Sequence, residues 1–183
     1  MKTLEVRRHS YTKKDRTSGS YLSPRGVALA RTIGTKTGPF DLVIASPFPR
    51  TSETAIAMGF AVDDIVDVGI DDGFWAEVSG GASPGVDHWD VYTRAISGKG
   101  KVARVAQAQK AAWLEALASL PDGGSVLFVS HGDAVEVGLA ACFGDRNLSE
   151  IGAKFRQLEG FRSPCEGGSF GDLQIMRITE VGE

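Results

Sequence analysis

Residues 126–133 read VLFVSHGD, and this stretch sets the fold class that we expect for the chain. A short run of consecutive apolar residues is typical of a strand that is buried on both faces of a parallel sheet. Polar and small residues follow the run at once, from Ser130 to Asp133. The pattern therefore predicts a buried strand that ends in a polar loop.

Two earlier stretches repeat this arrangement. The β-compatible segment Thr3–Arg7 is followed by Arg8-His9-Ser10, and the apolar segment Phe40–Ala45 is followed by the polar residues 46–50. In open parallel α/β sheets, ligands bind beyond the carboxyl ends of the strands. We therefore expect the three polar clusters to meet at one edge of a sheet.

Helices are predicted between these strands. Ser23 is a suitable N-cap and Pro24 a suitable first residue for a helix that ends near Gly34. Further helices are expected at Arg50–Met58, Asp87–Ser97, Lys101–Leu120 and Ala134–Phe143, and further strands at Ile65–Val68 and Leu173–Ile178. The glycine-rich stretch Asp71–Gly85 is expected to be irregular. Alternating strands and helices predict a three-layer α/β/α sandwich with a mainly parallel sheet, in a single domain over residues 1–183.

Composition excludes several classes of function. The chain has 183 residues and a net charge of −3, and it contains no Lys/Arg run that would follow a nucleic-acid backbone. No apolar run is long enough to span a bilayer, and the N-terminus shows no signal peptide. Cys142 lies in an apolar stretch, whereas Cys165 lies in a loop-like segment. We expect a cytoplasmic protein with reduced thiols and with no nucleic-acid or membrane partner.

Three motifs carry a resemblance to a known family. RHS at residues 8–10, SPFPRTSETA at residues 46–55 and SHGD at residues 130–133 resemble the histidine phosphatase superfamily, which includes the cofactor-dependent phosphoglycerate mutases. The resemblance follows the family's motif order and spacing, and it implies a phosphoglycerate mutase-like fold. It also implies that His9 attacks phosphorus and carries the phosphoryl group, and we expect this chemistry to need no metal or organic cofactor.

The chemistry of the residues agrees with that mechanism. An imidazole, with an unperturbed pKa of about 6.5, is a good nucleophile near neutral pH, and covalent transfer divides one hard displacement into two easier ones. Arg8 and Arg50 are candidate ligands of the phosphoryl oxygens, because guanidinium groups bind such oxygens in pairs. Arg50 also opens a predicted helix, whose N-terminus favours the same anion. Ser46, Arg50 and Thr54 match the family's motif spacing.

The resemblance assigns two further roles. His131 would hydrogen-bond the transferring phosphoryl group, and a protonated ring there would add positive charge. Glu77 is the candidate proton donor for the leaving group, with Phe74 and Trp75 supplying the apolar surroundings that keep a carboxyl protonated. Asp133 is the alternative acid, although a carboxylate at a helix N-terminus is also explained by the helix dipole.

Two departures from the family pattern favour a hydrolase over a mutase. The stretch around Glu77 matches the mutases' corresponding segment only loosely, and no long insertion is present that would enclose a sugar acid. Ser10 stands where the family usually has glycine, so its side chain would either narrow the phosphate cradle or donate to a phosphate oxygen. His88 is expected to pack locally. Lys13, Lys14 and Arg16 would either meet an extra anionic group of the substrate or be solvated charges.

The leading hypothesis is therefore a phosphomonoester hydrolase with a phosphohistidine intermediate. Its substrate would be a small phosphorylated metabolite or a phosphopeptide. A phosphoglycerate-type phosphomutase, which passes the phosphoryl group to a sugar acid, is the first alternative. A non-catalytic phosphate-binding module is the second.

Overall fold

The computed structural model describes residues 1–13, 20–82 and 84–178, so the predictions for Lys14 and Arg16 lie outside the described residues. Four strands form a parallel group in the order β3 (Asp64–Ile65), β2 (Leu42–Ala45), β4 (Ser125–Ser130) and β1 (Lys2–Arg8). On the other side of β1 the sheet continues antiparallel, through β5 (Gly160–Glu166) with β6 (Ser169–Phe170) and β7 (Gln174–Met176). The sheet is therefore mainly parallel, with an antiparallel end.

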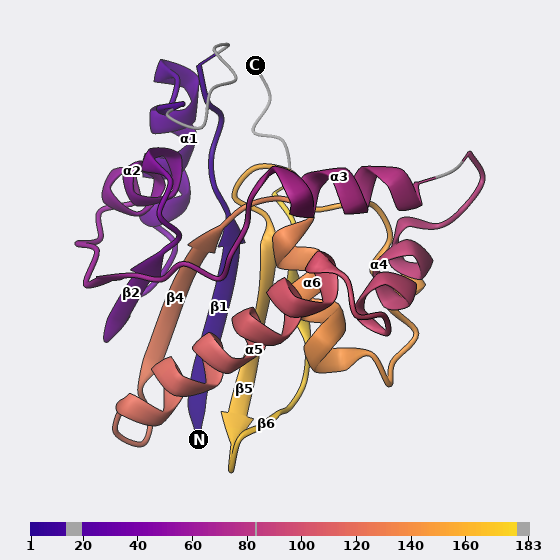
Figure 1. The fold of residues 1–183 in the computed structure, drawn as a ribbon. Helices are drawn as coiled ribbons and strands as arrows, with labels where there is room; N and C mark the ends of the chain where they lie inside the picture. Colours follow the sequence, from indigo (N-terminus) through magenta and orange to yellow (C-terminus); the bar gives the residue numbers. More distant parts are fainter. Residues whose placement is uncertain (14–19, 83, 179–183) are drawn as a thin grey trace.

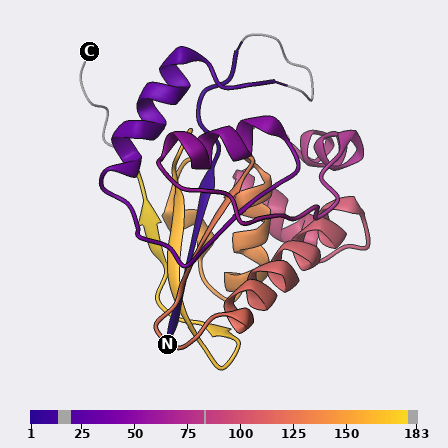
Figure 2. The ribbon, with the colours of Figure 1, turned by 90° about the vertical axis from the view of Figure 1, so that its left-hand side faces the viewer.

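Helices cover both faces of the sheet (Figures 1 and 2). One face carries α1 (Pro24–Gly34) and α2 (Pro49–Ala57). The other carries α3 (Asp72–Gly81), α4 (His88–Ile96), α5 (Lys101–Ser119) and α6 (Ala134–Phe143), and a short 3₁₀ turn, Leu148–Ile151, follows α6. Within the described residues, no helix is both long and apolar enough to cross a membrane.

Strand β4 shows why the fold has three layers. Because side chains alternate between the two faces of a strand, Val126 and Phe128 join the core under α5 and α6, whereas Leu127 and Val129 join the core under α1 and α2. A continuous apolar run is therefore needed to fill both cores at once. The three-layer α/β/α sandwich predicted from this run is confirmed.

Several local predictions are confirmed as well. Ser23 caps α1, because its hydroxyl accepts the N–H of Gly26 at 3.1 Å, and Pro24 is the first helical residue. The other four predicted helices begin and end within one or two residues of their expected limits. The predicted third strand is reduced to the two residues of β3.

Two local predictions are wrong. The stretch Asp71–Gly85 contains α3, which Asp71 caps by accepting the N–H of Phe74 at 3.1 Å, and which buries Phe74 and Val78 in the core. The cap and the buried face outweigh the low helix propensity of glycine. Cys165 lies in β5 and is buried, because β5 pairs with the central strand β1. Both Cys142 and Cys165 are free thiols.

Candidate active site

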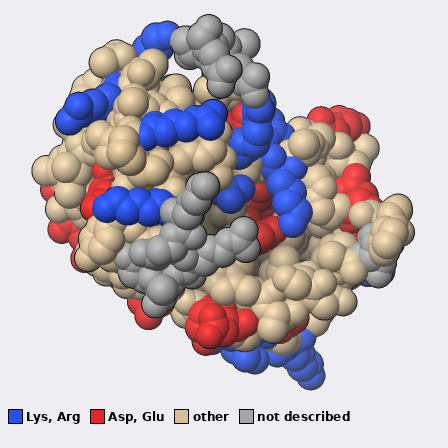
Figure 3. All heavy atoms as spheres, turned by 90° about the horizontal axis from the view of Figure 1, so that it is seen from above, with Lys and Arg blue, Asp and Glu red and all other residues tan. Residues whose placement is uncertain are grey.

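The three polar clusters meet at the carboxyl edge of the parallel strands. This edge is at the top of Figure 1, and Figure 3 views it from above, with Lys and Arg side chains gathered around it. The N–H of His9 donates to the carbonyl of Ser130 at 2.8 Å, which ties the loop after β1 to the loop after β4. The rings of His9 and His131 consequently lie 5.4 Å apart between centroids. The structure thus brings together residues that are far apart in the sequence.

The ring of His9 has a defined hydrogen-bonding pattern. Its Nδ1 lies 2.7 Å from the carbonyl oxygen of Ser10, and because a carbonyl only accepts, Nδ1 carries the proton. In the neutral ring the lone pair is then on Nε2. Burial, together with the positive charges of Arg50 and Arg8, lowers the pKa of His9 to about 4, although the bond to Ser10 acts in the opposite direction. The ring of His9 is therefore neutral at physiological pH.

His131 is held in the opposite tautomer. The Nε of Arg50 donates to Nδ1 of His131 at 3.2 Å, and Nε2 of His131 lies 2.6 Å from Oγ of Ser46. Because a guanidinium only donates, Nδ1 is the acceptor and Nε2 carries the proton. Burial, His9, Arg50 and Arg8 together hold the pKa of His131 well below its usual value. The expectation of a protonated ring is therefore wrong for this arrangement, in which the nearby cations already supply the positive charge.

One nitrogen of the Arg8 guanidinium is hydrogen-bonded, and another is buried without a partner among the described residues. Its Nη1 donates to the carbonyl of Phe155 at 2.7 Å. Its Nε is buried and has no partner among the described residues. The guanidinium lies against Gly132, where an added Cβ would be only 2.7 Å from Cζ of Arg8. A glycine at this position therefore allows the Arg8 guanidinium to lie beside His131.

Ser10 has a structural role. Its hydroxyl donates to the carbonyl of Gly26 at 2.8 Å, and its N–H donates to Oγ1 of Thr54 at 3.0 Å. The side chain is fully buried between the loop after β1 and helix α1. Both expectations for Ser10, a narrowed phosphate cradle and a bond to a phosphate oxygen, are therefore wrong, because the hydroxyl is committed to α1.

Aromatic rings form the walls beside His131. The ring of Phe48 lies 4.9 Å from that of His131, and the guanidinium of Arg50 lies 4.7 Å from the centre of the same phenyl ring. The ring of Trp75, on α3, lies 6.3 Å from that of His131. These rings exclude water from one side of the imidazole and keep Arg50 in place.

The two candidate acids lie in different places. Oε2 of Glu77 accepts the backbone N–H of Lys101 at 2.6 Å, which places this carboxylate at the start of α5. Asp133 precedes α6 with a positive φ of 56°, and its Oδ1 accepts bonds from the hydroxyl of Tyr92 and, at 2.5 Å, from Nζ of Lys154. Among the described residues, neither carboxylate is hydrogen-bonded to His9 or His131. His88 packs against the rings of Trp89 and Tyr92, as expected.

The sequence reasoning missed the residues that support Arg8. Phe155 acts through its backbone, so its residue type gives no signal. Glu136 is fully buried on α6 and receives the N–H of Phe155 at 2.8 Å. A single carboxylate inside the apolar helix AVEVGLAACF was the available signal, because an unpaired charge in such a helix needs a specific partner.

Comparisons with known proteins agree with this geometry. A family model matches residues 6–153, and the chain belongs to the histidine phosphatase superfamily (branch 1). The resemblance seen in the motifs is therefore confirmed. A comparison with curated protein sequences gave no significant match.

Solved structures share the fold at low sequence identity. A phosphoserine phosphatase from Entamoeba histolytica, in complex with 3-phosphoglyceric acid, is 15% identical over 95% of this chain and 97% of its own, with a TM-score of 0.65. A phosphoglycerate mutase from Bacillus anthracis is 20% identical over 92% and 90%, with a TM-score of 0.65. A mycobacterial glucosyl-3-phosphoglycerate phosphatase, in complex with VO3, is 19% identical over 94% and 97%, with a TM-score of 0.63. The phosphoglycerate mutase-like fold is confirmed.

Proposed function

We propose that this protein is a phosphomonoester hydrolase that works through a phosphohistidine at His9. The observation that carries the proposal is the tautomer of His9. Its Nδ1 proton is bound to the carbonyl of Ser10, so the Nε2 lone pair is free, and the guanidinium groups of Arg50 and Arg8 lie close enough to act on the ring. A neutral nucleophile among fixed cations suits an anionic electrophile, and it suits a phosphoryl group in particular.

The first step of the proposed reaction transfers the phosphoryl group to the protein. The Nε2 lone pair forms the N–P bond while the ester P–O bond breaks, and the leaving oxygen takes up a proton. Negative charge on the equatorial oxygens would be met by the guanidinium groups of Arg8 and Arg50. His131, which carries its proton on Nε2, would turn this donor from Ser46 to the phosphoryl group.

The second step returns His9 to its starting state. Water forms a new P–O bond as the P–N bond breaks, and it returns a proton to the carboxylate that protonated the leaving oxygen. The step yields inorganic phosphate and a neutral imidazole. We propose water as the acceptor and a small phosphorylated metabolite or a phosphopeptide as the substrate. An assay for phosphoglycerate interconversion, run beside p-nitrophenyl phosphate hydrolysis, separates the hydrolase from the phosphomutase. Interconversion at a rate above hydrolysis would reverse the assignment.

The proton for the leaving oxygen is assigned to Glu77, with Asp133 as the alternative. Glu77 performs this role if its carboxyl exchanges the bond to Lys101 for one to the substrate. Glu77→Gln keeps an acceptor oxygen for that backbone N–H and removes the acid. A fall in kcat of roughly a hundredfold or more supports Glu77, in line with the usual contribution of general acids. An unchanged kcat, together with a fall in Asp133→Asn, moves the role to Asp133.

The central test is a screen of phosphomonoesters with the wild-type protein and His9→Ala side by side. We expect the substitution to abolish turnover, because no other group replaces the attacking nitrogen. His88→Ala is the matched control, since it removes a histidine that packs on α4 against Trp89 and Tyr92. Normal turnover by His9→Ala would refute the nucleophile. A wild-type protein that binds phosphate and turns over no ester would support the non-catalytic alternative.

A further inference from the structure

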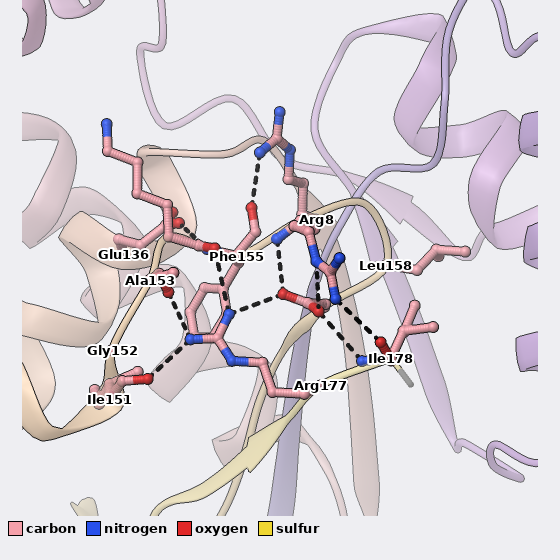
Figure 4. Close-up of polar contacts among 12 residues, drawn as sticks. Arg8, Glu136, Ile151, Gly152, Ala153, Phe155, Leu158, Arg177 and Ile178 are labelled. Carbon is pink, nitrogen blue, oxygen red and sulfur yellow. Dashed lines mark hydrogen bonds and ion pairs between the residues drawn. The ribbon is translucent and has the colours of Figure 1, made fainter. Parts of the chain in front are cut away.

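The segment of residues 151–159, between α6 and β5, wraps around Arg8 (Figure 4). The carbonyl of Phe155 accepts the bond from Nη1 of Arg8. The backbone of Arg8 is also bound, because its N–H donates to the carbonyl of Glu159 at 2.9 Å and its carbonyl accepts the N–H of Leu158 at 3.0 Å. The position of the Arg8 guanidinium therefore depends on the conformation of this segment.

Arg177, which follows β7, holds the segment from one side. Its guanidinium donates to Oε2 of the buried Glu159 at 2.8 Å and lies 4.9 Å from the centre of the Phe155 ring. It also donates to three backbone carbonyls of the segment, at distances of 2.5–3.3 Å. These carbonyls belong to Ile151, Ala153 and Lys154. One side chain from the end of the sheet thus fixes the path of the chain up to Phe155.

Glu136 holds the segment from the other side. Its Oε1 accepts the N–H of Phe155 at 2.8 Å, whereas its Oε2 is buried and has no partner among the described residues. Burial raises the pKa of Glu136 to about 7. The charged and titratable groups that act on it are Asp133, Arg8 and Tyr92. Figure 4 shows Glu136 and Arg8 on either side of the Phe155 backbone.

We propose that Glu136 and Arg177 are positioning residues for Arg8. Together they immobilise the Phe155 peptide, whose carbonyl anchors Nη1 and so fixes the guanidinium that would meet the phosphoryl group. This inference rests on the proposed function and names residues that serve the same site. A guanidinium that is anchored before the anion arrives loses less conformational freedom on binding, so the anchor strengthens binding of the phosphoryl group.

A double-mutant cycle with inorganic phosphate as the probe tests the proposal. The phosphate Kd is measured by calorimetry for the wild-type protein, Arg177→Met, Arg8→Met and the double variant. We expect Arg177→Met to raise the Kd by roughly tenfold, the effect of one charge-assisted hydrogen bond. In the Arg8→Met background, the same substitution should change the Kd by less than about twofold.

Arg146→Met is the matched control. Arg146 also donates to a backbone carbonyl, that of Gly171 at 2.9 Å, and its guanidinium lies 5.1 Å from the ring of Phe143, away from the site. We expect its phosphate Kd to match the wild type. If Arg177→Met fails to fold, Arg177→Lys replaces it, because it keeps the charge and loses the fork that binds several carbonyls. An effect of the Arg177 substitution that persists without Arg8, or that equals the control, would overturn the proposal.

Glu136→Gln provides a second measurement, the pH dependence of KM, which a purely structural role of Glu136 would not change. The amide oxygen still accepts the N–H of Phe155, so positioning is kept, but the charge is removed. As Glu136 ionises above about pH 7, it offsets the charge of Arg8, and the wild-type KM should rise relative to that of the variant. Parallel KM profiles for the two proteins between pH 6 and pH 8.5 would contradict the coupling of Glu136 to Arg8.

Failure of this inference is distinguishable from failure of the proposed function. If wild-type protein hydrolyses phosphomonoesters and His9→Ala does not, the proposed function stands whatever the cycle shows. If the effects of Arg177→Met and Arg8→Met on the phosphate Kd are additive in that active protein, the positioning roles are refuted and the proposed function is unaffected. If the wild-type protein hydrolyses no ester, but the cycle shows the expected coupling between Arg177 and Arg8 in phosphate binding, the positioning roles are supported and the hydrolase proposal is refuted.

Discussion

The two halves of the sheet contribute differently to the site. The parallel half, β1, β2 and β4, ends in the loops that carry His9, Arg50 and His131, which are the groups proposed to touch the phosphoryl group. The antiparallel half, β5 and β7, is flanked by Glu159 and Arg177. Arg177 contacts the segment around Arg8, to which Glu159 belongs. Arg8 belongs to both halves, because β1 is the strand at which they join.

This difference between the two halves predicts which substitutions change kcat and which change KM or stability. Substitutions that remove His9, Arg50 or His131 should lower kcat, because they take away groups that act on the transferring phosphoryl group. Substitutions in the antiparallel half should raise KM and lower stability, because they loosen the support of one ligand. The following substitutions test this division between the two halves of the sheet.

The largest effect is expected from Arg50→Met, at the end of β2. This change removes the guanidinium that donates to His131 and faces the proposed phosphoryl site. By analogy with transition-state arginines in phosphoryl transfer, kcat/KM should fall by about 10³. Arg50→Lys should recover little of the loss, because an ammonium lacks the planar fork. Arg104→Met, on the exposed side of α5, is the control. Equal kcat/KM values for the Arg50 and Arg104 variants would contradict the role of the parallel half in turnover.

Acid should affect both turnover and stability through His9. Because its pKa is about 4, kcat/KM should not fall through protonation of this ring until the pH approaches 4, and it should then fall about tenfold per pH unit. The unfolded chain, with an ordinary histidine pKa of about 6.5, binds more protons between pH 6.5 and 4. The folded state therefore loses stability as the pH falls through that window, by about 3 kcal/mol in total.

Urea unfolding at pH 7 and pH 4 measures that loss. His9→Gln should lose less stability than the wild type between the two pH values, by about the same 3 kcal/mol. An identical pH dependence in the two proteins would show that His9 is not buried in its neutral form.

Gly132→Ala should have an intermediate effect. The new methyl group would lie 2.7 Å from Cζ of Arg8, so the guanidinium must move away from its anchor at Phe155. We expect KM to rise by roughly tenfold with a smaller change in kcat, since positioning is disturbed while the nucleophile is intact. Gly80→Ala is the control, because nothing lies within 4 Å of a Cβ there. A KM equal to that of the control would show that Arg8 tolerates displacement.

The smallest kinetic effect is expected from Glu159→Gln, in the antiparallel half. Glu159 is buried and accepts bonds from Arg177 and from the backbone N–H groups of Arg156 and Ile178. Loss of the charge should cost about 1–3 kcal/mol of stability and raise KM by a few fold, with kcat unchanged. Chemical denaturation and steady-state kinetics measure both, with the exposed Glu150→Gln as control. A fall in kcat alone would contradict the division between the halves.

The parallel half was predictable from sequence because its signals are local. Continuous apolar runs mark strands that are buried on both faces, and β2 and β4 are both of this kind. Ser23 and Pro24 mark the start of α1 through bonds within a few residues. The motif residues of the site lie directly after strands of the parallel half, so the strand pattern indicated that they converge if the strand order brings the three strand ends together.

The antiparallel half was not predictable in this way. Strand β5 reads GFRSPCE, and its glycine, arginine and proline interrupt the alternation by which strands are recognised. Its burial comes from pairing with β1, which is distant in sequence. The support of Arg8 was hidden for a similar reason, because it runs through the carbonyl of Phe155 and through Arg177, whose partners are mostly backbone oxygens.

The central place of β1 has a consequence for synthesis of the chain. Residues 2–8 lie between a strand at 125–130 and a strand at 160–166, so neither neighbour exists when this segment leaves the ribosome. Contacts between such distant segments slow folding, and until they form, both edges of the strand and the apolar Leu4 and Val6 are open to other chains. A nascent chain stalled before residue 160 should therefore depend on chaperones, because His9 is made early and the strands that support Arg8 are made last.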